Sequence, residues 1–265
     1  MQKKPNPIQS FLNRLGKTLK KLFQIRKPRI PSRPPTSVPQ KNPSWKTPGK
    51  PSPSSRPTLK ESRNQRLARI FRERGYEVFK RGKFKQSLRY FNMALGYYPK
   101  DLDSLKMRGL AYLRLKDYLN SFKDFQKASR LQPKNGELYF YQGLCQFYLN
   151  QYSKAIPFFS KAIQLNTKDY RSFAYRGYCY LKLKNLNQAE QDFLSAQKLD
   201  PKDPVTAYNL GCIYALKGQP QEALLWLKRA LKKGYHDFEN LKKDPDLKSL
   251  HQNPEFQRLL KKRWK

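Results

Sequence analysis

The main shortage in this 265-residue sequence is of acidic residues. Only 19 Asp and Glu stand against 56 Lys and Arg, which gives a formal net charge of +37, and none of the acids lies within residues 1–60. So large a charge exceeds what solubility requires, and it therefore predicts an acidic partner. Nucleic acid, an anionic membrane surface and a strongly acidic protein all fit this prediction equally.

Cysteine, histidine and long apolar runs are also scarce, and each shortage excludes a class of site. The three cysteines have no CxxC spacing, so we expect neither disulfides nor a zinc site, but a reducing, cytoplasmic setting. His236 and His251 have no nucleophile or carboxylate at catalytic spacing, and no glycine-rich phosphate motif occurs. No run approaches the roughly 18 apolar residues of a membrane span, and no secretory signal core is present. We therefore expect no enzyme activity, no cofactor and no metal.

The N-terminal part, residues 1–57, divides into two segments. Residues 28–57 are rich in proline and basic residues, which predicts a disordered, extended linker. Residues 1–27 carry an apolar stripe at helical spacing among lysines and arginines, which predicts a basic amphipathic helix. The residues expected to face a membrane surface are Phe11, Leu12, Leu15, Lys17, Leu19, Lys20, Leu22 and Phe23.

Three interpretations of this predicted helix stay open. An acid-free apolar face collared by lysine suits an anionic membrane, which would place the protein peripherally on the cytoplasmic face. A helix docked in a partner's groove, or on the rest of this chain, is the second interpretation. An organelle-targeting sequence is the third, although Lys outnumbers Arg by 10 to 5 within residues 1–60.

From residue 68 onward the sequence repeats itself with a fixed 34-residue period. A glycine series, an alanine series and an aromatic series share this period: Gly75, Gly109, Gly143, Gly177 and Gly211; Ala94, Ala128, Ala162, Ala196 and Ala230; Phe91, Phe125, Phe159, Phe193 and then Leu227. Parallel series at one period predict a repeat protein. The units are 68–101, 102–135, 136–169, 170–203 and 204–237.

These residues and their spacing closely resemble the tetratricopeptide repeat. The resemblance implies an all-α fold, a right-handed α-solenoid of five 34-residue helix–turn–helix repeats. The glycines would let the two helices of a repeat approach closely, and the aromatic residues would fill the space against the next repeat. We expect the repeat region to span 58–237, to begin with a capping box at Thr58 and Glu61, and to end in a helical cap over 238–265.

The resemblance also implies that the first helix of each repeat lines a concave groove for a protein or peptide. The groove residues on the family's pattern are Arg72, Tyr76, Lys106, Arg114, Phe140, Tyr141, Tyr148, Arg171, Tyr175, Tyr178, Lys182, Tyr208 and Asn209. The Lys and Asn with which the best-known groove of the family clamps a carboxylate are replaced by Arg72 and Tyr76, so an extended acidic and apolar peptide fits better. Binding to RNA, the ribosome or another nucleic acid remains the alternative, because tyrosines among lysines also suit bases and phosphates.

Overall fold

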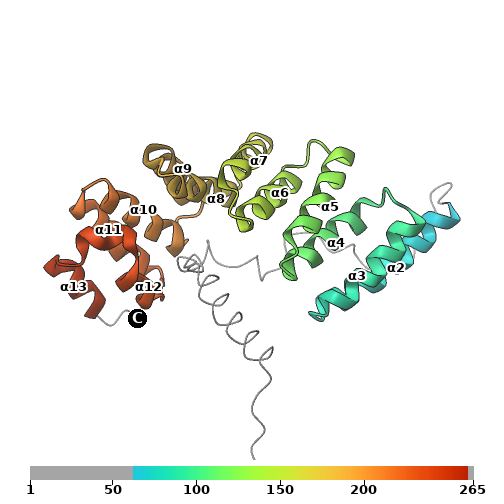
Figure 1. The fold of residues 1–265 in the computed structure, drawn as a ribbon, viewed down its shortest axis with the longest axis horizontal. Coiled ribbons are helices and arrows are strands. Elements are labelled where there is room, and N and C mark those ends of the chain that lie inside the picture. Colours follow the sequence, from blue (N-terminus) through green and yellow to red (C-terminus); the bar gives the residue numbers. More distant parts are fainter. Residues whose placement is uncertain (1–61, 262–265) are drawn as a thin grey trace, which may run out of the picture. The chain divides into compact units, whose positions relative to one another are not determined.

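The structure is a computed structural model that describes residues 62–261, in which helices follow one another in pairs and no strand occurs (Figure 1). The first helices of the pairs are α2 (Arg63–Lys80), α4 (Leu102–Arg114), α6 (Gly136–Tyr148), α8 (Tyr170–Lys182) and α10 (Pro204–Leu216). The second helices are α3 (Phe84–Tyr97), α5 (Tyr118–Leu131), α7 (Tyr152–Leu165), α9 (Leu186–Leu199) and α11 (Pro220–Lys232). Each helix packs mainly on its neighbours in sequence. The predicted fold class, an all-α solenoid of helix–turn–helix repeats, is confirmed.

The glycine series explains why the two helices of each pair lie close together. A Cβ added at Gly143 would lie 2.8 Å from Phe159 Cε1, and one at Gly109 would lie 3.0 Å from Phe125 Cε2. The aromatic ring of the second helix thus fills the space that the glycine leaves on the first. The ring also makes the predicted contact with the next repeat, since Phe125 stacks on Tyr141 with centroids 4.7 Å apart.

The tight turns within the pairs share a left-handed residue. Its φ angle is positive in all five pairs, at Gly82, Lys116, Asn150, Lys184 and Gly218. Glycine adopts this conformation without strain, asparagine with little, and lysine at a cost. The repeat therefore requires a positive φ at this position, and the residues that adopt it differ widely in their preference for that conformation.

The first described helix begins later than the sequence predicted. The hydroxyl of Ser62 accepts the backbone N–H of Gln65, and the side chain of Gln65 accepts the N–H of Ser62. This reciprocal capping box starts α2 at Arg63, whereas the predicted box at Thr58 and Glu61 lies outside the described residues. The predicted helix at 1–27 and linker at 28–57 also lie outside them.

The C-terminal end packs on the last helix pair. It consists of α12 (Phe238–Lys243), the 3-10 helix η1 (Pro245–Leu250) and α13 (Pro254–Lys261). Their buried apolar residues join one cluster with α10 and α11; they are Leu241, Leu247, Leu250, Phe256 and Leu259. Tyr208 of α10 donates a hydrogen bond to the buried Asp244 carboxylate and stacks on Tyr235 at 4.3 Å. No helix within residues 62–261 is long and apolar enough to cross a membrane.

Candidate functional site

The residues predicted to line the groove all lie on the first helices of the five pairs, and they divide into two groups by burial. The buried group is Lys106, Phe140, Tyr141, Tyr175, Tyr178, Tyr208 and Asn209. The partly exposed group is Arg72, Tyr76, Arg114, Tyr148, Arg171 and Lys182. The second group supplies most of the side-chain surface that a partner could contact.

The buried aromatic residues form the centre of the third and fourth pairs. Phe140 packs edge-on against Tyr141 and Tyr175, with ring centroids 5.4 and 5.7 Å away. Tyr175 also stacks on Phe159 at 5.7 Å. Burial raises the pKa of both tyrosines well above the ordinary value, so their hydroxyl groups stay protonated. These rings hold neighbouring repeats together.

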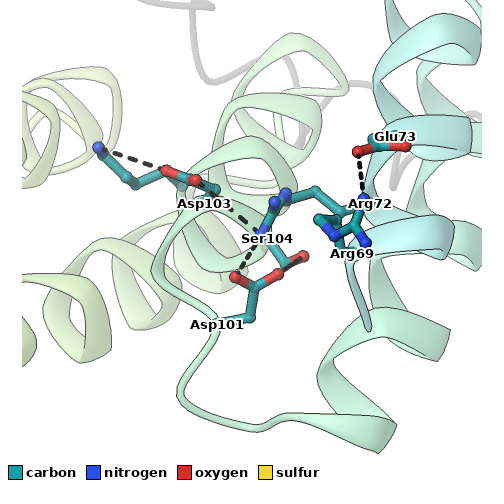
Figure 2. A network of polar contacts seen from close by, with 7 residues as sticks. Arg69, Arg72, Glu73, Asp101, Asp103 and Ser104 are labelled. Carbon is teal, nitrogen blue, oxygen red and sulfur yellow. Dashed lines mark hydrogen bonds and ion pairs between the residues drawn. The ribbon is translucent and has the colours of Figure 1, made fainter. Parts of the chain in front are cut away.

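A polar network joins the first and second pairs (Figure 2). Arg72 Nη1 lies 2.7 Å from Asp101 Oδ1, and the Ser104 hydroxyl donates to Asp101 Oδ2 at 2.5 Å. Asp103 Oδ2 lies 4.0 Å from Arg72 Nη1, and Asp103 Oδ1 lies 4.0 Å from Lys106 Nζ. Burial lowers the pKa of Lys106, while Asp103 acts in the opposite direction. Of the two predicted groove cations, Arg72 thus links the first pair to the second, whereas Lys106 contacts a carboxylate of its own helix.

The fourth pair repeats part of this network. Arg171 Nε lies 2.7 Å from Asp169 Oδ1, and the Ser172 hydroxyl donates to the other carboxylate oxygen at 2.8 Å. The guanidinium carbon of Arg171 lies 4.6 Å from the centroid of the Phe140 ring, close enough for a cation–π contact. Arg171 therefore connects the start of α8 to the preceding repeat.

Three predicted groove residues form a row at the last turn of successive first helices. Arg114, Tyr148 and Lys182 share one repeat position on α4, α6 and α8, and all are partly exposed. Tyr148 stacks on Tyr118 at 5.1 Å, and Lys182 Nζ lies 5.1 Å from the centroid of the Tyr178 ring. Burial raises the pKa of Tyr148, which keeps its hydroxyl neutral and able to donate. This Arg–Tyr–Lys row thus offers a neutral ring between two cations.

Two ion pairs were not anticipated from the sequence. Arg108 makes two hydrogen bonds to the Asp124 carboxylate, at 2.8 and 2.7 Å, and Arg176 makes the same two bonds to Asp192. The partners are 16 residues apart, the same interval that separates each packing glycine from its aromatic partner. That interval is the signal that could have revealed them. They join the two helices of a pair.

No cluster of three or more His, Cys, Asp or Glu within residues 62–261 could hold a metal ion. The cysteines Cys145, Cys179 and Cys212 are buried and free. Burial raises the pKa of the Cys145 thiol to about 12, so it stays protonated and unreactive.

The match to a curated protein is short. A chloroplastic protein of Arabidopsis thaliana is 44% identical over 57 residues, which are 22% of this chain and only 17% of that protein.

Solved structures share the fold at low identity. MamA from Desulfovibrio magneticus RS-1 has a TM-score of 0.60 at 22% identity, covering 63% of this chain and 94% of that one. YrrB, described as a TPR protein with an unusual peptide-binding site, has a TM-score of 0.57 at 24% identity, covering 66% and 90%. PilF of Pseudomonas aeruginosa has a TM-score of 0.59 at 17% identity, covering 67% and 81%.

Family models of the tetratricopeptide repeat match residues 72–135, 136–169, 170–203 and 206–232, which together make up more than half of the sequence. Each matched stretch coincides with helix pairs of the solenoid. The chain belongs to the tetratricopeptide-repeat family.

Proposed function

We propose that this chain is a non-enzymatic scaffold that binds a protein partner along the first helices of its repeats. The observation that carries the proposal is the Arg–Tyr–Lys row, in which Arg114, Tyr148 and Lys182 occupy one position in three successive repeats. A partner lying across the repeats would meet a cation, a ring and a second cation in turn. The peptide-binding site named for YrrB, which shares the fold, is consistent with this use.

The chemistry of the row favours an extended segment with acidic and apolar residues. Guanidinium and ammonium groups bind carboxylates through charge-assisted hydrogen bonds. The Tyr148 ring supplies apolar area together with one hydroxyl, and its stacking on Tyr118 fixes its orientation before a partner arrives. An acidic peptide would also be attracted by the net charge of +37.

We further propose that the acid-free N-terminal residues place this scaffold on an acidic surface, with the cytoplasmic face of a membrane as the first candidate. Composition supports this, since residues 1–60 hold 15 Lys and Arg and no Asp or Glu. Each basic residue near an anionic membrane contributes about 1 kcal/mol to binding.

Affinity capture from a lysate tests the groove, with nuclease present and at two salt concentrations. The variant Arg114→Gln with Lys182→Gln removes two charges from the row, and Tyr148→Ala removes the ring. The matched control, Lys85→Gln with Arg89→Gln, removes two exposed charges from α3. The wild type and the control should retain a common protein that both row variants lose. Equal retention by the row variants would contradict the groove proposal.

A further inference from the structure

Each turn from one repeat to the next carries an exposed lysine at the same position. The four residues, called here the lysine edge, are Lys100, Lys134, Lys168 and Lys202. All four turns are closed by the same backbone hydrogen bond, from the N–H of the residue after the lysine to a carbonyl three residues earlier. The bond is 3.0 Å from Asp101 to Tyr98 and 3.1 Å from Asn135 to Gln132. The lysine therefore occupies an equivalent place on every turn.

These turns lie together at one end of the helix pairs. Successive helices are joined by tight turns and alternate in direction, so every connection between repeats lies at the opposite end from the turns within repeats (Figure 1). Equivalent positions in stacked repeats form a row. Successive lysines are two helices apart along the chain, and because neighbouring helices pack about 8–10 Å apart, they are spaced on the order of 10–20 Å.

The segments that carry the lysine edge are almost free of acid. Residues 93–100, 127–134, 161–168 and 195–202 contain 8 Lys and Arg and one acidic residue, Asp200. The Asp200 carboxylate accepts the backbone N–H of Lys202 at 3.1 Å, just as the Asn166 side chain accepts that of Lys168. The one carboxylate in these segments is therefore hydrogen-bonded within its own turn.

The acidic residues directly after three of the lysines are held at the starts of the first helices. Asp101 pairs with Arg72 and Asp169 with Arg171, and both carboxylates have only 9% of their side-chain surface exposed. Asp203 accepts the N–H of Thr206 at 2.9 Å. These carboxylates are compensated by partners of their own, whereas the lysines are exposed.

Helix stability does not account for these lysines. A cation is favourable near the C-terminus of a helix, which explains basic residues in the last turn of a second helix, such as Arg130. Lys134 and its equivalents, however, lie beyond that helix and one residue before the N-cap of the next. There the positive end of the next helix opposes the negative end of the preceding one, whose C-cap Gln132 lies two residues before Lys134, so the two dipoles give a cation little net stabilisation. Their recurrence points to a ligand.

We propose that the lysine edge binds the phosphate backbone of nucleic acid without reading base sequence. Evenly spaced ammonium groups match a linear polyanion, and lysine contacts phosphate as a point charge. The same segments also expose apolar residues, namely Met93 (44%), Tyr97 (40%), Leu131 (39%) and Leu199 (40%), so a bilayer is the competing occupant that the vesicle measurement below tests. This surface is distinct from the Arg–Tyr–Lys row and does not depend on the proposed groove function.

Fluorescence anisotropy with a labelled single-stranded poly(U) RNA and the full-length protein tests the proposal between about 50 and 200 mM salt. The edge variant replaces all four lysines of the edge with Gln. The matched control also replaces four lysines with Gln. They are exposed at or beside the turns within the first four repeats and are Lys83, Lys116, Lys154 and Lys184. The edge variant should bind about tenfold more weakly, and its slope of log K against log salt should fall by up to about 3, at about 0.7 for each phosphate that is no longer neutralised. The control should keep most of the wild-type affinity and slope.

Four outcomes would overturn the proposal. Equal losses in both variants would mean that RNA responds only to the total charge. No loss in either variant would mean that RNA binds elsewhere on the chain. Competition by polyglutamate that is as strong as that by RNA of equal charge would mean that the edge does not distinguish phosphate from carboxylate. Loss of binding to phosphatidylserine vesicles by the edge variant, with RNA binding unchanged, would assign the edge to a membrane. Melting temperatures equal to that of the wild type would show that both variants fold.

Discussion

Gly143 and Gly96 are both helical glycines, but their surroundings differ. A Cβ at Gly143 would lie 2.8 Å from Phe159 Cε1, whereas nothing lies within 4 Å of a Cβ at Gly96. Gly143→Ala should therefore destabilise the fold by about 1–3 kcal/mol through overpacking, and Gly143→Leu by more. Gly96→Ala should stabilise it by about 0.5–1 kcal/mol, because alanine favours a helix. Urea denaturation measures both changes, and a stable Gly143→Leu variant would contradict the repeat register.

Lys184 offers a stabilising substitution for a backbone reason. Its φ is 59°, whereas the equivalent residues Gly82 and Gly218 meet the same requirement without a side chain. The left-handed conformation costs a non-glycine residue about 1–2 kcal/mol, and a glycine there avoids this cost. Glycine, however, loses more conformational entropy when the chain folds, which cancels about 0.5–1 kcal/mol of the gain. Lys184→Gly should thus raise the free energy of unfolding by up to about 1 kcal/mol. Lys184→Ala keeps the strain and is the control; equal melting temperatures for the two variants would refute the argument.

Single residues differ in how far the sequence predicts them. The close approach at Gly143 was predictable, because one residue type meets one spatial demand in every repeat. The left-handed turns at Lys116 and Lys184 were not, because lysine shows no preference for that conformation. The sequence also places a cation at Arg72 without revealing that Asp101, 29 residues later, pairs with it. A contact between repeats depends on two residues at different repeat positions. A series of one residue type at the 34-residue period does not show which two residues pair.

At the scale of helices, pairs two and four are joined by ion pairs where the fifth has apolar residues. Arg176 on α8 donates twice to Asp192 on α9 and once to Ser160 on α7, the last at 2.9 Å. Asp192 is buried, with a side chain 7% exposed. Leu210 and Trp226 hold the equivalent positions in the fifth pair. Equivalent positions between two helices therefore hold an ion pair in the fourth pair and apolar residues in the fifth.

This equivalence predicts how the fourth pair responds to substitution. Arg176→Leu alone leaves the Asp192 carboxylate buried without its cation and should destabilise the fold by about 3 kcal/mol. Arg176→Leu combined with Asp192→Trp installs the apolar pair of the fifth repeat and should recover most of that loss. Urea denaturation of both variants measures the difference. A double variant no more stable than Arg176→Leu would show that the apolar pair cannot replace the ion pair at this position.

Helix boundaries were predictable where the repeat period fixes them and less so at its edge. The first helices of pairs two to five begin 34 residues apart, at Leu102 (α4), Gly136 (α6), Tyr170 (α8) and Pro204 (α10). The first helix has no preceding repeat to define its start, and two segments there satisfy the capping pattern: Thr58 with Glu61, and Ser62 with Gln65. The structure uses the second box, which directly precedes the apolar residues that pack on α3.

At the scale of the whole molecule, charge is distributed unevenly along the chain. All 19 acidic residues lie after residue 60, and the described ion pairs, such as Arg108–Asp124, use several of them within the solenoid. Residues 1–60 have no acid to offset their 15 Lys and Arg. An anionic membrane should therefore attract the N-terminal part more strongly than the repeats.

Deleting residues 1–57 separates the contributions of the two parts. Residues 62–261 contain an extensive buried core of their own, so the shortened chain should melt cooperatively at the temperature of the full-length protein. It should no longer sediment with vesicles containing phosphatidylserine, whereas the full-length protein should, and neither should sediment with neutral vesicles. Because surface charges are screened by salt, the full-length protein should also be released as salt is raised. Unchanged sedimentation after the deletion would eliminate the N-terminal anchor and assign membrane binding to the solenoid.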